Sequence, residues 1–172
     1  MTLMFAYGSN LNLAEMAKRC PDAVPLGHIR LDGWKLVFRG VADVIREDGA
    51  VCYGGVWRIT PECERTLDVY EGVGSGVYRK EYIPSKPTPL GETEILVYTM
   101  TSTGIMPPSK CYYEVIKEGY RNFCMPTEAF ADLERALCES HDNKALTHVE
   151  RRRRMRTGHP AFAERPDTRG TR

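Results

Sequence analysis

The sequence lacks several features that would place it among membrane, metal-binding or disulfide-stapled proteins. No apolar run approaches the roughly 20 residues that a membrane-spanning helix needs. The six cysteines include no C-x-x-C pair, and Cys138 with His141 is a C-x-x-H fragment without a second pair at zinc-site spacing. We therefore expect no membrane span, no metal site and cysteines that stay reduced.

The chain also shows no internal repeats, and its first residues show no basic segment followed by an apolar one. The latter pattern is typical of a secretory signal, so its absence predicts a cytoplasmic location. With 172 residues, of which 42% are hydrophobic, the chain is long enough to form one domain with a well-buried core. The sequence does not indicate an oligomeric state.

The net charge of +1 conceals an uneven distribution of charge. Eight arginines lie between residues 150 and 172 with three acidic residues among them, whereas residues 1–149 carry 16 basic and 20 acidic side chains. Because residues 149–172 show no apolar periodicity, we expect a basic, disordered tail there, after a single domain over residues 1–148. Such a tail could contact RNA or acidic partners through charge alone, and we expect no nucleic-acid contact elsewhere.

Apolar periodicity predicts a mixture of strands and helices along the chain. The predicted strands cover residues 2–7, 24–39, 51–59, 78–83 and 94–100. The predicted helices cover residues 12–20 and 60–70, with two more beginning at Ser109 and Thr127. Asp48-Gly49 predicts a hairpin, and Leu67 and Tyr70 are expected to face the core. These elements fit an α+β domain built on a small mixed, mainly antiparallel β-barrel with flanking helices.

The end of the first strand is the most informative local feature. Gly8 has no Cβ to hinder an unusual backbone turn, and the short side chains of Ser9 and Asn10 can cap the free N–H groups of a helix start. A strand that ends in such a turn directs several backbone N–H groups toward one point. The turn is therefore a candidate seat for a carbonyl oxygen or an anion.

Five short motifs recur together in one known family. In chain order they are FAYGSNL at residues 5–11, GVW at 55–57, YEGVGSGVY at 70–78, VYTMT at 97–101, and PPS at 107–109 followed by Tyr112. This ordered set resembles the γ-glutamylcyclotransferase family of the AIG2-like superfamily, over roughly residues 3 to 140. The resemblance implies a compact mixed barrel with flanking helices, conversion of a small γ-glutamyl substrate to 5-oxoproline, and no metal or organic cofactor.

The resemblance also implies which residues act. It makes Glu71 the proton-transfer residue. It makes the first motif and two later tyrosines the substrate-binding residues, namely Met4, Phe5, Ala6, Tyr7, Gly8, Ser9, Asn10, Tyr98 and Tyr112. The Y-G-S-N-L letters resemble the branch that acts on γ-glutamyl amino acids more than the branches specific for γ-glutamylamines or for glutathione.

The implied reaction needs few protein groups, because the substrate's own α-amine attacks its γ-carbonyl and closes a five-membered ring. One carboxylate between the two nitrogens can take a proton from the amine and give one to the leaving nitrogen. Burial of Glu71 among aromatics would raise its pKa toward the working pH; the candidate aromatics are Tyr7, Tyr70, Tyr78 and Tyr98. The N–H groups of the Gly8 turn could hold either the oxyanion or the substrate's α-carboxylate.

Other chemistries find less support in the sequence. Gly72-x-Gly74-x-Gly76 lacks the Lys-Ser/Thr of a phosphate-binding P-loop, and Ser9 lacks the G-x-S-x-G context of a hydrolase nucleophile. The alternative from another class is a non-catalytic module on the same fold. It would bind a small ligand or a protein, and the Arg-rich tail would contact RNA or acidic partners.

Overall fold

A single five-stranded sheet is the framework of the computed structural model, which describes residues 1–84 and 94–156. The strand order is β2-β3-β1-β5-β4. β1 pairs antiparallel with β3 and parallel with β5, and the remaining pairs are antiparallel. The strands are β1 (Thr2–Ala6), β2 (Val24–Phe38), β3 (Ala42–Ile59), β4 (Tyr78–Pro84) and β5 (Glu94–Met100).

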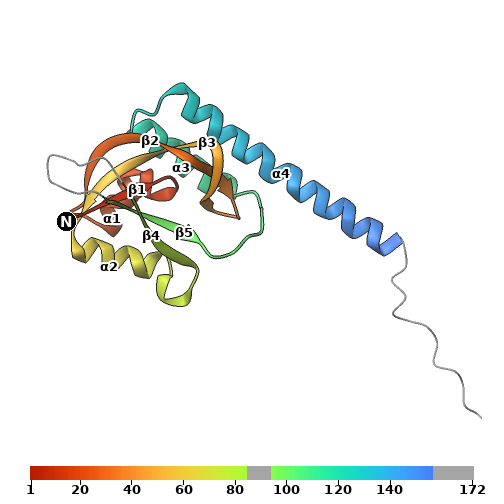
Figure 1. Cartoon of the computed structure of the whole chain (residues 1–172), viewed down its shortest axis with the longest axis horizontal. Coiled ribbons are helices and arrows are strands. Elements are labelled where there is room, and N and C mark those ends of the chain that lie inside the picture. Colours follow the sequence, from red (N-terminus) through yellow and green to blue (C-terminus); the bar gives the residue numbers. More distant parts are fainter. Residues whose placement is uncertain (85–93, 157–172) are drawn as a thin grey trace, which may run out of the picture.

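The sheet is open rather than closed into a barrel. Its two edge strands, β2 and β4, do not pair with each other in the described part of the chain. Figure 1 shows the long β2 and β3 ribbons arching over the shorter strands, which gives the sheet a barrel-like curvature without closure. The predicted α+β class, a mainly antiparallel barrel or curved sheet with flanking helices, is confirmed, and the sheet is curved without closing.

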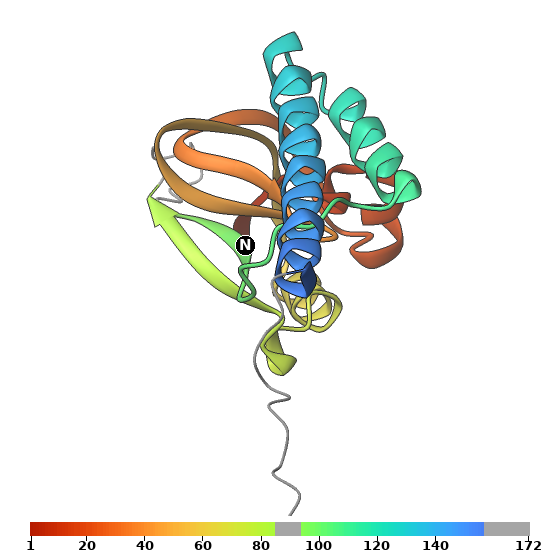
Figure 2. The same ribbon diagram turned by 90° about the vertical axis from the view of Figure 1, so that its right-hand side faces the viewer.

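Helices surround this sheet. They are η1 (Ser9–Leu11), α1 (Leu13–Arg19), α2 (Pro61–Tyr70), η2 (Val73–Ser75), α3 (Lys110–Asn122) and α4 (Thr127–Arg156). α4 contacts β2 and β3, and Figure 2 shows α3 beside the first turns of α4. No helix formed by the described residues combines the length and the apolar character that crossing a bilayer requires.

The helix starts follow the capping signals in the sequence. Asn12, Thr60 and Ser109 each accept, through a side-chain oxygen, the backbone N–H of the residue three positions on. Such a cap satisfies one of the N–H groups that the first helical turn leaves without a partner. The start of α2 after Thr60 is therefore confirmed. Of Asn10 and Asn12, the two candidate caps for the helix that ends near Cys20, Asn12 is the one that caps α1.

The hairpin predicted at Asp48-Gly49 is wrong. β2 and β3 are joined at residues 39–41, and Asp48-Gly49 lies inside β3, where the pairing with β2 shifts register. Gly49 of β3 has φ 78° and Gly33 of β2 has φ 77°, so both strands depart from extended geometry there. Asp-Gly favours a positive φ. Both a tight turn and an irregularity within a strand use a positive φ, so the pair does not distinguish the two.

Helix α4 continues to Arg156, beyond the domain boundary expected at residue 148 (Figure 1). Residues 149–156 therefore have helical backbone, where the sequence predicted an irregular tail. Extending an existing helix costs far less than nucleating a new one, so a segment without apolar periodicity can continue a helix that begins before it. Residues 157–172 lie outside the described residues, and the division of the chain at 148 stays a prediction.

Candidate active site

A pocket lies where the end of β1, the end of α2 and the start of α3 come together. Its lining comes from six segments distant in sequence: Phe5, Ala6, Tyr7, Gly8, Ser9, Asn10, Ala42, Glu71, Tyr78, Tyr98 and Tyr112. The structure thus brings Glu71 together with the turn after β1 and with both tyrosines that the sequence analysis proposed. Ala42 is the lining residue for which the sequence offered no signal.

Two of the residues expected around this pocket lie elsewhere. Met4 is 1% exposed in the core and does not line the pocket. β1 is the central strand, so all of its side chains from Leu3 onward are buried, and only its last residues reach the pocket. Tyr70 was expected to face inward but is 51% exposed. It is the last residue of α2, and its ring stacks on Arg19 instead, 3.9 Å from the guanidinium carbon.

Glu71 is held at a helix end that turns sharply. Its backbone N–H donates to the carbonyl of Leu67 at 2.8 Å, as a final helical bond. Gly72 follows in the left-handed region with φ 65°, a conformation that only glycine adopts at little cost. The carbonyl of Gly72 then accepts the N–H of Val77 at 3.1 Å. This closed turn fixes the direction in which Glu71 leaves α2.

The opposite side of the pocket is the turn into η1, and its backbone is equally fixed. The N–H of Leu11 donates to the carbonyl of Gly8 at 3.0 Å, and the indole N–H of Trp57 donates to the carbonyl of Asn10 at 2.9 Å. Gly119 of α3 packs directly on this turn. A Cβ added there would lie 2.5 Å from the Cβ of Leu11, so a glycine is needed for this approach.

The two sides meet in one hydrogen bond. The Asn10 side-chain amide donates to Oε1 of Glu71 at 2.8 Å. Burial raises the pKa of Glu71, while the Asn10 hydrogen bond and the positive charge of Arg19 lower it, and burial prevails. The pKa of Glu71 is therefore raised from its ordinary value, in the direction expected from the sequence.

Three of the pocket tyrosines donate their hydroxyl protons to protein acceptors. Tyr7 donates to the carbonyl of Tyr98 at 2.6 Å, and Tyr78 donates to the carbonyl of Ala42 at 3.1 Å. Tyr98 donates to Oδ1 of Asp68 at 2.7 Å. The Tyr98 phenol, which the resemblance makes a substrate-binding group, anchors α2 through Asp68 in this structure.

Tyr112 is bonded differently from the other three. Its hydroxyl oxygen accepts the backbone N–H of Ala42 at 3.2 Å. Burial raises the pKa of Tyr112, and the backbone N–H groups of Ala42 and Ser9 oppose that rise. Within the described part of the chain, the Tyr112 hydroxyl makes no hydrogen bond as a donor. Tyr112 is thus the pocket phenol that is free to donate to a ligand.

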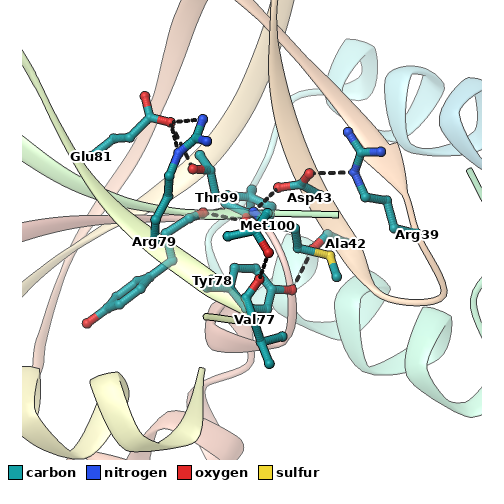
Figure 3. Close-up of polar contacts among 12 residues, drawn as sticks. Arg39, Ala42, Asp43, Val77, Tyr78, Arg79, Glu81, Thr99 and Met100 are labelled. Carbon is teal, nitrogen blue, oxygen red and sulfur yellow. Dashed lines mark hydrogen bonds and ion pairs between the residues drawn. The ribbon is translucent and has the colours of Figure 1, made fainter. Parts of the chain in front are cut away.

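A buried ion pair stands behind the pocket wall at Ala42 (Figure 3). Asp43 accepts from Nε of Arg39 at 2.7 Å and from the backbone N–H of Met100 at 2.8 Å. The side chain of Arg39 is 8% exposed and that of Asp43 is 1% exposed. These bonds connect the start of β3 directly to the end of β5. They hold in place two of the strands that line the pocket.

The arrangement suits acid–base chemistry on a small polar molecule. It offers a carboxyl group with a raised pKa, a phenol able to donate, and a turn rich in backbone N–H groups. Among residues 1–84 and 94–143, no cluster of three or more metal-ligating side chains occurs. The fold and the site together define a small α+β protein with one carboxyl group in a tyrosine-lined pocket.

Comparisons with known proteins identify the group to which the chain belongs. Residues 51–133 match the family model of the AIG2-like family. The γ-glutamylcyclotransferase of Mus musculus is 34% identical over 138 residues, which cover 73% of each chain. That of Bos taurus is 32% identical over 160 residues, which cover 86% of this chain and 85% of the bovine protein. The chain therefore belongs to the γ-glutamylcyclotransferase family.

Structural comparison agrees with this assignment. A solved structure of a γ-glutamyl cyclotransferase matches with a TM-score of 0.67 at 28% identity, covering 77% of this chain and 86% of that chain. The resemblance inferred from the five ordered motifs is thereby confirmed, together with the fold class.

Proposed function

We propose that this protein is a cyclotransferase that converts a γ-glutamyl amino acid or γ-glutamyl amide to 5-oxoproline and the free amine. The observation that carries the proposal is the position of Glu71. Its carboxyl group faces the turn after β1 inside a tyrosine-lined pocket, and its pKa is raised by burial. The names of the mouse and bovine relatives support the same reaction class.

The proposed reaction is an intramolecular displacement. The substrate's α-amine nitrogen forms a bond to the γ-carbonyl carbon, and the amide bond between that carbon and the leaving nitrogen breaks. Both reacting groups belong to one molecule, so the protein has to hold the glutamyl chain folded more than it has to supply a nucleophile. Well-oriented intramolecular attack reaches effective molarities on the order of 10⁵–10⁸ M.

Glu71 handles the protons of this displacement. As a carboxylate it accepts a proton from the α-ammonium group, which frees the lone pair for attack. As a carboxylic acid it gives that proton to the departing nitrogen, which would otherwise leave as an unstable amide anion. The attacking nitrogen loses its second proton as the amide bond breaks and the released amine takes it up, so 5-oxoproline keeps one N–H and the amine leaves as an ammonium ion. A raised pKa suits both steps, because proton transfer is most efficient when the pKa lies near the working pH.

The turn after β1 and Tyr112 supply the polar contacts to the substrate. The backbone N–H groups of residues 8–10 would hold either the developing oxyanion or the α-carboxylate, and the free hydroxyl proton of Tyr112 would hold the other oxygen-bearing group. Phe5, Ala6 and Tyr7 would form the apolar side of the glutamyl pocket. The Y-G-S-N-L motif leads us to propose a γ-glutamyl amino acid as substrate.

A product assay tests this function directly. Purified protein is incubated with γ-glutamyl-L-alanine, γ-glutamylamines and glutathione in parallel, and 5-oxoproline is quantified by mass spectrometry. We expect 5-oxoproline and alanine in equal amounts from the first substrate, and a loss of this product in Glu71→Gln. Absence of 5-oxoproline from the entire panel would favour the non-catalytic binding module instead.

We expect the partner to be a small molecule and the location to be the cytoplasm. Contacts of residues 149–172 with RNA or acidic partners stay a prediction.

A further inference from the structure

Arg19, a residue that does not line the pocket, makes four directed contacts next to it. It is the last residue of α1, and its side chain is 11% exposed. One guanidinium nitrogen donates to Oδ1 of Asn10 at 2.7 Å and to Oγ of Ser9 at 3.3 Å, and the other donates to Glu15 at 3.1 Å. The guanidinium plane lies over the ring of Tyr70. An arginine held in this way has little rotational freedom left.

Asn10 connects Arg19 to Glu71. Its amide oxygen accepts from Arg19, its amide nitrogen donates to Glu71 at 2.8 Å, and its backbone carbonyl accepts from Trp57. An asparagine amide has a donor end and an acceptor end that differ little in shape. Arginine can only donate, so its presence obliges the oxygen of Asn10 to face it. The amide nitrogen must then face Glu71.

We propose that Arg19 is a positioning residue, which fixes the orientation of the Asn10 amide and thereby sets the pH range in which Glu71 exchanges a proton. The proposal rests on the proposed function of Glu71, and it adds a residue that neither the motifs nor the pocket lining contains. Arg19 acts through Asn10 and through its own charge, without touching the substrate.

The orientation of Asn10 affects the two protonation states of Glu71 differently. An N–H that faces the carboxyl group can donate to the carboxylate, and this favours the charged state. A rotated amide would present its oxygen, which accepts from the protonated acid and repels the carboxylate. Arg19 adds a direct electrostatic effect of the same sign. Both effects oppose burial, and together they keep Glu71 ionised at lower pH than burial alone would allow.

The other titratable groups that face Glu71 cannot replace Arg19 in this role. They are phenols from four elements: Tyr7 after β1, Tyr78 of β4, Tyr98 of β5 and Tyr112 of α3. Burial raises the pKa of every one of them, so they stay neutral near physiological pH. Among the described residues, the charge that acts on Glu71 is therefore that of Arg19.

Three variants separate orientation from charge. Arg19→Met keeps the apolar stem but loses both the charge and the donors, and Arg19→Lys keeps the charge but loses the planar fork. Lys18→Met is the matched control, because Lys18 is the preceding residue of α1, is 72% exposed and, among the described residues, bonds only Glu15. For each protein, the pH dependence of kcat/KM for γ-glutamyl-L-alanine is measured. The Glu71 carboxyl group is also titrated by carbon-13 NMR without substrate.

In Arg19→Met we expect the acid limb of kcat/KM and the NMR midpoint of Glu71 both to move to higher pH. At a pH below the wild-type limb, kcat/KM falls about tenfold, within the range of couplings seen in hydrogen-bond networks. Arg19→Lys should move both midpoints less and in the same direction, and Lys18→Met should move neither.

Each outcome bears on the proposal. Unmoved midpoints in a folded Arg19→Met protein would overturn it. Midpoints in Arg19→Lys that equal those of the wild type would show that the charge alone suffices, and would overturn the role of the Asn10 orientation. Arg19→Lys also decides the question if Arg19→Met does not fold. A wild-type protein that forms no 5-oxoproline refutes the proposed function, and the NMR titration then still tests the link between Arg19 and Glu71.

Discussion

Glu64 and Glu71 lie at opposite ends of α2, and their surroundings move their pKa values in opposite directions. Burial favours the neutral acid at both positions. Glu64 accepts from the ammonium group of Lys80 at 2.6 Å and from Thr2 at 3.0 Å, and these bonds outweigh burial, so its pKa is lowered. Glu71 accepts from the neutral amide of Asn10, and burial prevails.

The difference shows how one helix can carry a structural carboxylate and a proton-exchanging one. Lys80 on β4 contacts both Glu64 and Asp68, and Asp68 also accepts from Tyr98 on β5. This cluster fastens α2 to the sheet. The fastening directs the end of the helix, with Glu71, into the pocket. A direct cation keeps a carboxylate charged, whereas a neutral donor leaves it able to change state.

Replacing each of the two glutamates by glutamine in turn should give the largest difference between them. Glu71→Gln should lower kcat by on the order of 10²–10⁴, the usual contribution of a general acid–base group. Thermal and denaturant stability should change little. Glu64→Gln should do the opposite, with near-normal kcat and a free energy of unfolding lower by about 1 kcal/mol. Product assays and urea unfolding measure the two effects.

Glu64→Gln is the matched control for Glu71→Gln, because it removes the same charge from the same helix. A Glu71→Gln protein with near-wild-type kcat would refute the assignment of the proton shuttle. A Glu64→Gln protein that is stable but inactive would show that Glu64, rather than Glu71, is needed for turnover.

The pH dependence of turnover should reflect the raised pKa of Glu71. Glu71 must be ionised to accept the ammonium proton, so kcat/KM should fall about tenfold for each pH unit below the pKa of Glu71. Because that pKa is raised, the acid limb should lie above about 4.3, the ordinary glutamate value. Steady-state rates over a pH series measure it. A limb at or below the ordinary value contradicts the account.

Removing Lys80 should make Glu64 resemble Glu71. In Lys80→Met, Glu64 and Asp68 lose their shared cation, and the free energy of unfolding should fall by roughly 1–3 kcal/mol at neutral pH. The lowered pKa of Glu64 means that its stabilisation is present above about pH 4.3 and is lost as the pH falls through the folded-state pKa. The deficit of the variant should therefore shrink in acid.

Urea unfolding of wild type and Lys80→Met between neutral and acidic pH measures this change. Carboxyl titration of the same variant should show a higher pKa for Glu64 and an unchanged one for Glu71. A deficit that is equal at all pH values would mean that Lys80 stabilises the fold through packing alone.

Tyr98→Phe gives the smallest effect. The variant loses the hydrogen bond to Asp68 but keeps the ring in the pocket, so the free energy of unfolding should fall by about 1 kcal/mol. KM for γ-glutamyl-L-alanine should stay within about twofold, because the hydroxyl group is already engaged by the protein. A large rise in KM would show that Tyr98 releases Asp68 and binds the substrate.

Local signals in the sequence predicted much of the framework. Thr60 caps α2 as expected, and the first strand ends at the turn that begins with Gly8. The motif resemblance implied that Glu71 and this turn belong to one site, and the hydrogen bond from Asn10 to Glu71 joins them across some sixty residues of sequence. Capping and strand periodicity are properties of a few neighbouring residues, which explains why they could be recognised without the fold.

Features that depend on which elements pack together were missed. Tyr70 continues the apolar face of α2 in the sequence, but Arg19 covers its ring outside the pocket. Ala42 lines the pocket because the start of β3 lies beside the end of β5, where Asp43 accepts the N–H of Met100. Asp48-Gly49 predicted a turn, because Asp-Gly favours a positive φ. The pairing of β2 with β3 on both sides of Gly49 shows that its positive φ belongs to an irregularity inside a strand.

The most direct measurement is a carbon-13 NMR titration of the glutamate carboxyl groups in the wild-type protein, with Glu64→Gln and Glu71→Gln used to assign the two signals. We expect a midpoint above the ordinary glutamate value for Glu71, coincident with the acid limb of kcat/KM, and one below it for Glu64. A Glu71 midpoint at or below the ordinary value, or one that does not coincide with the acid limb, would contradict this expectation.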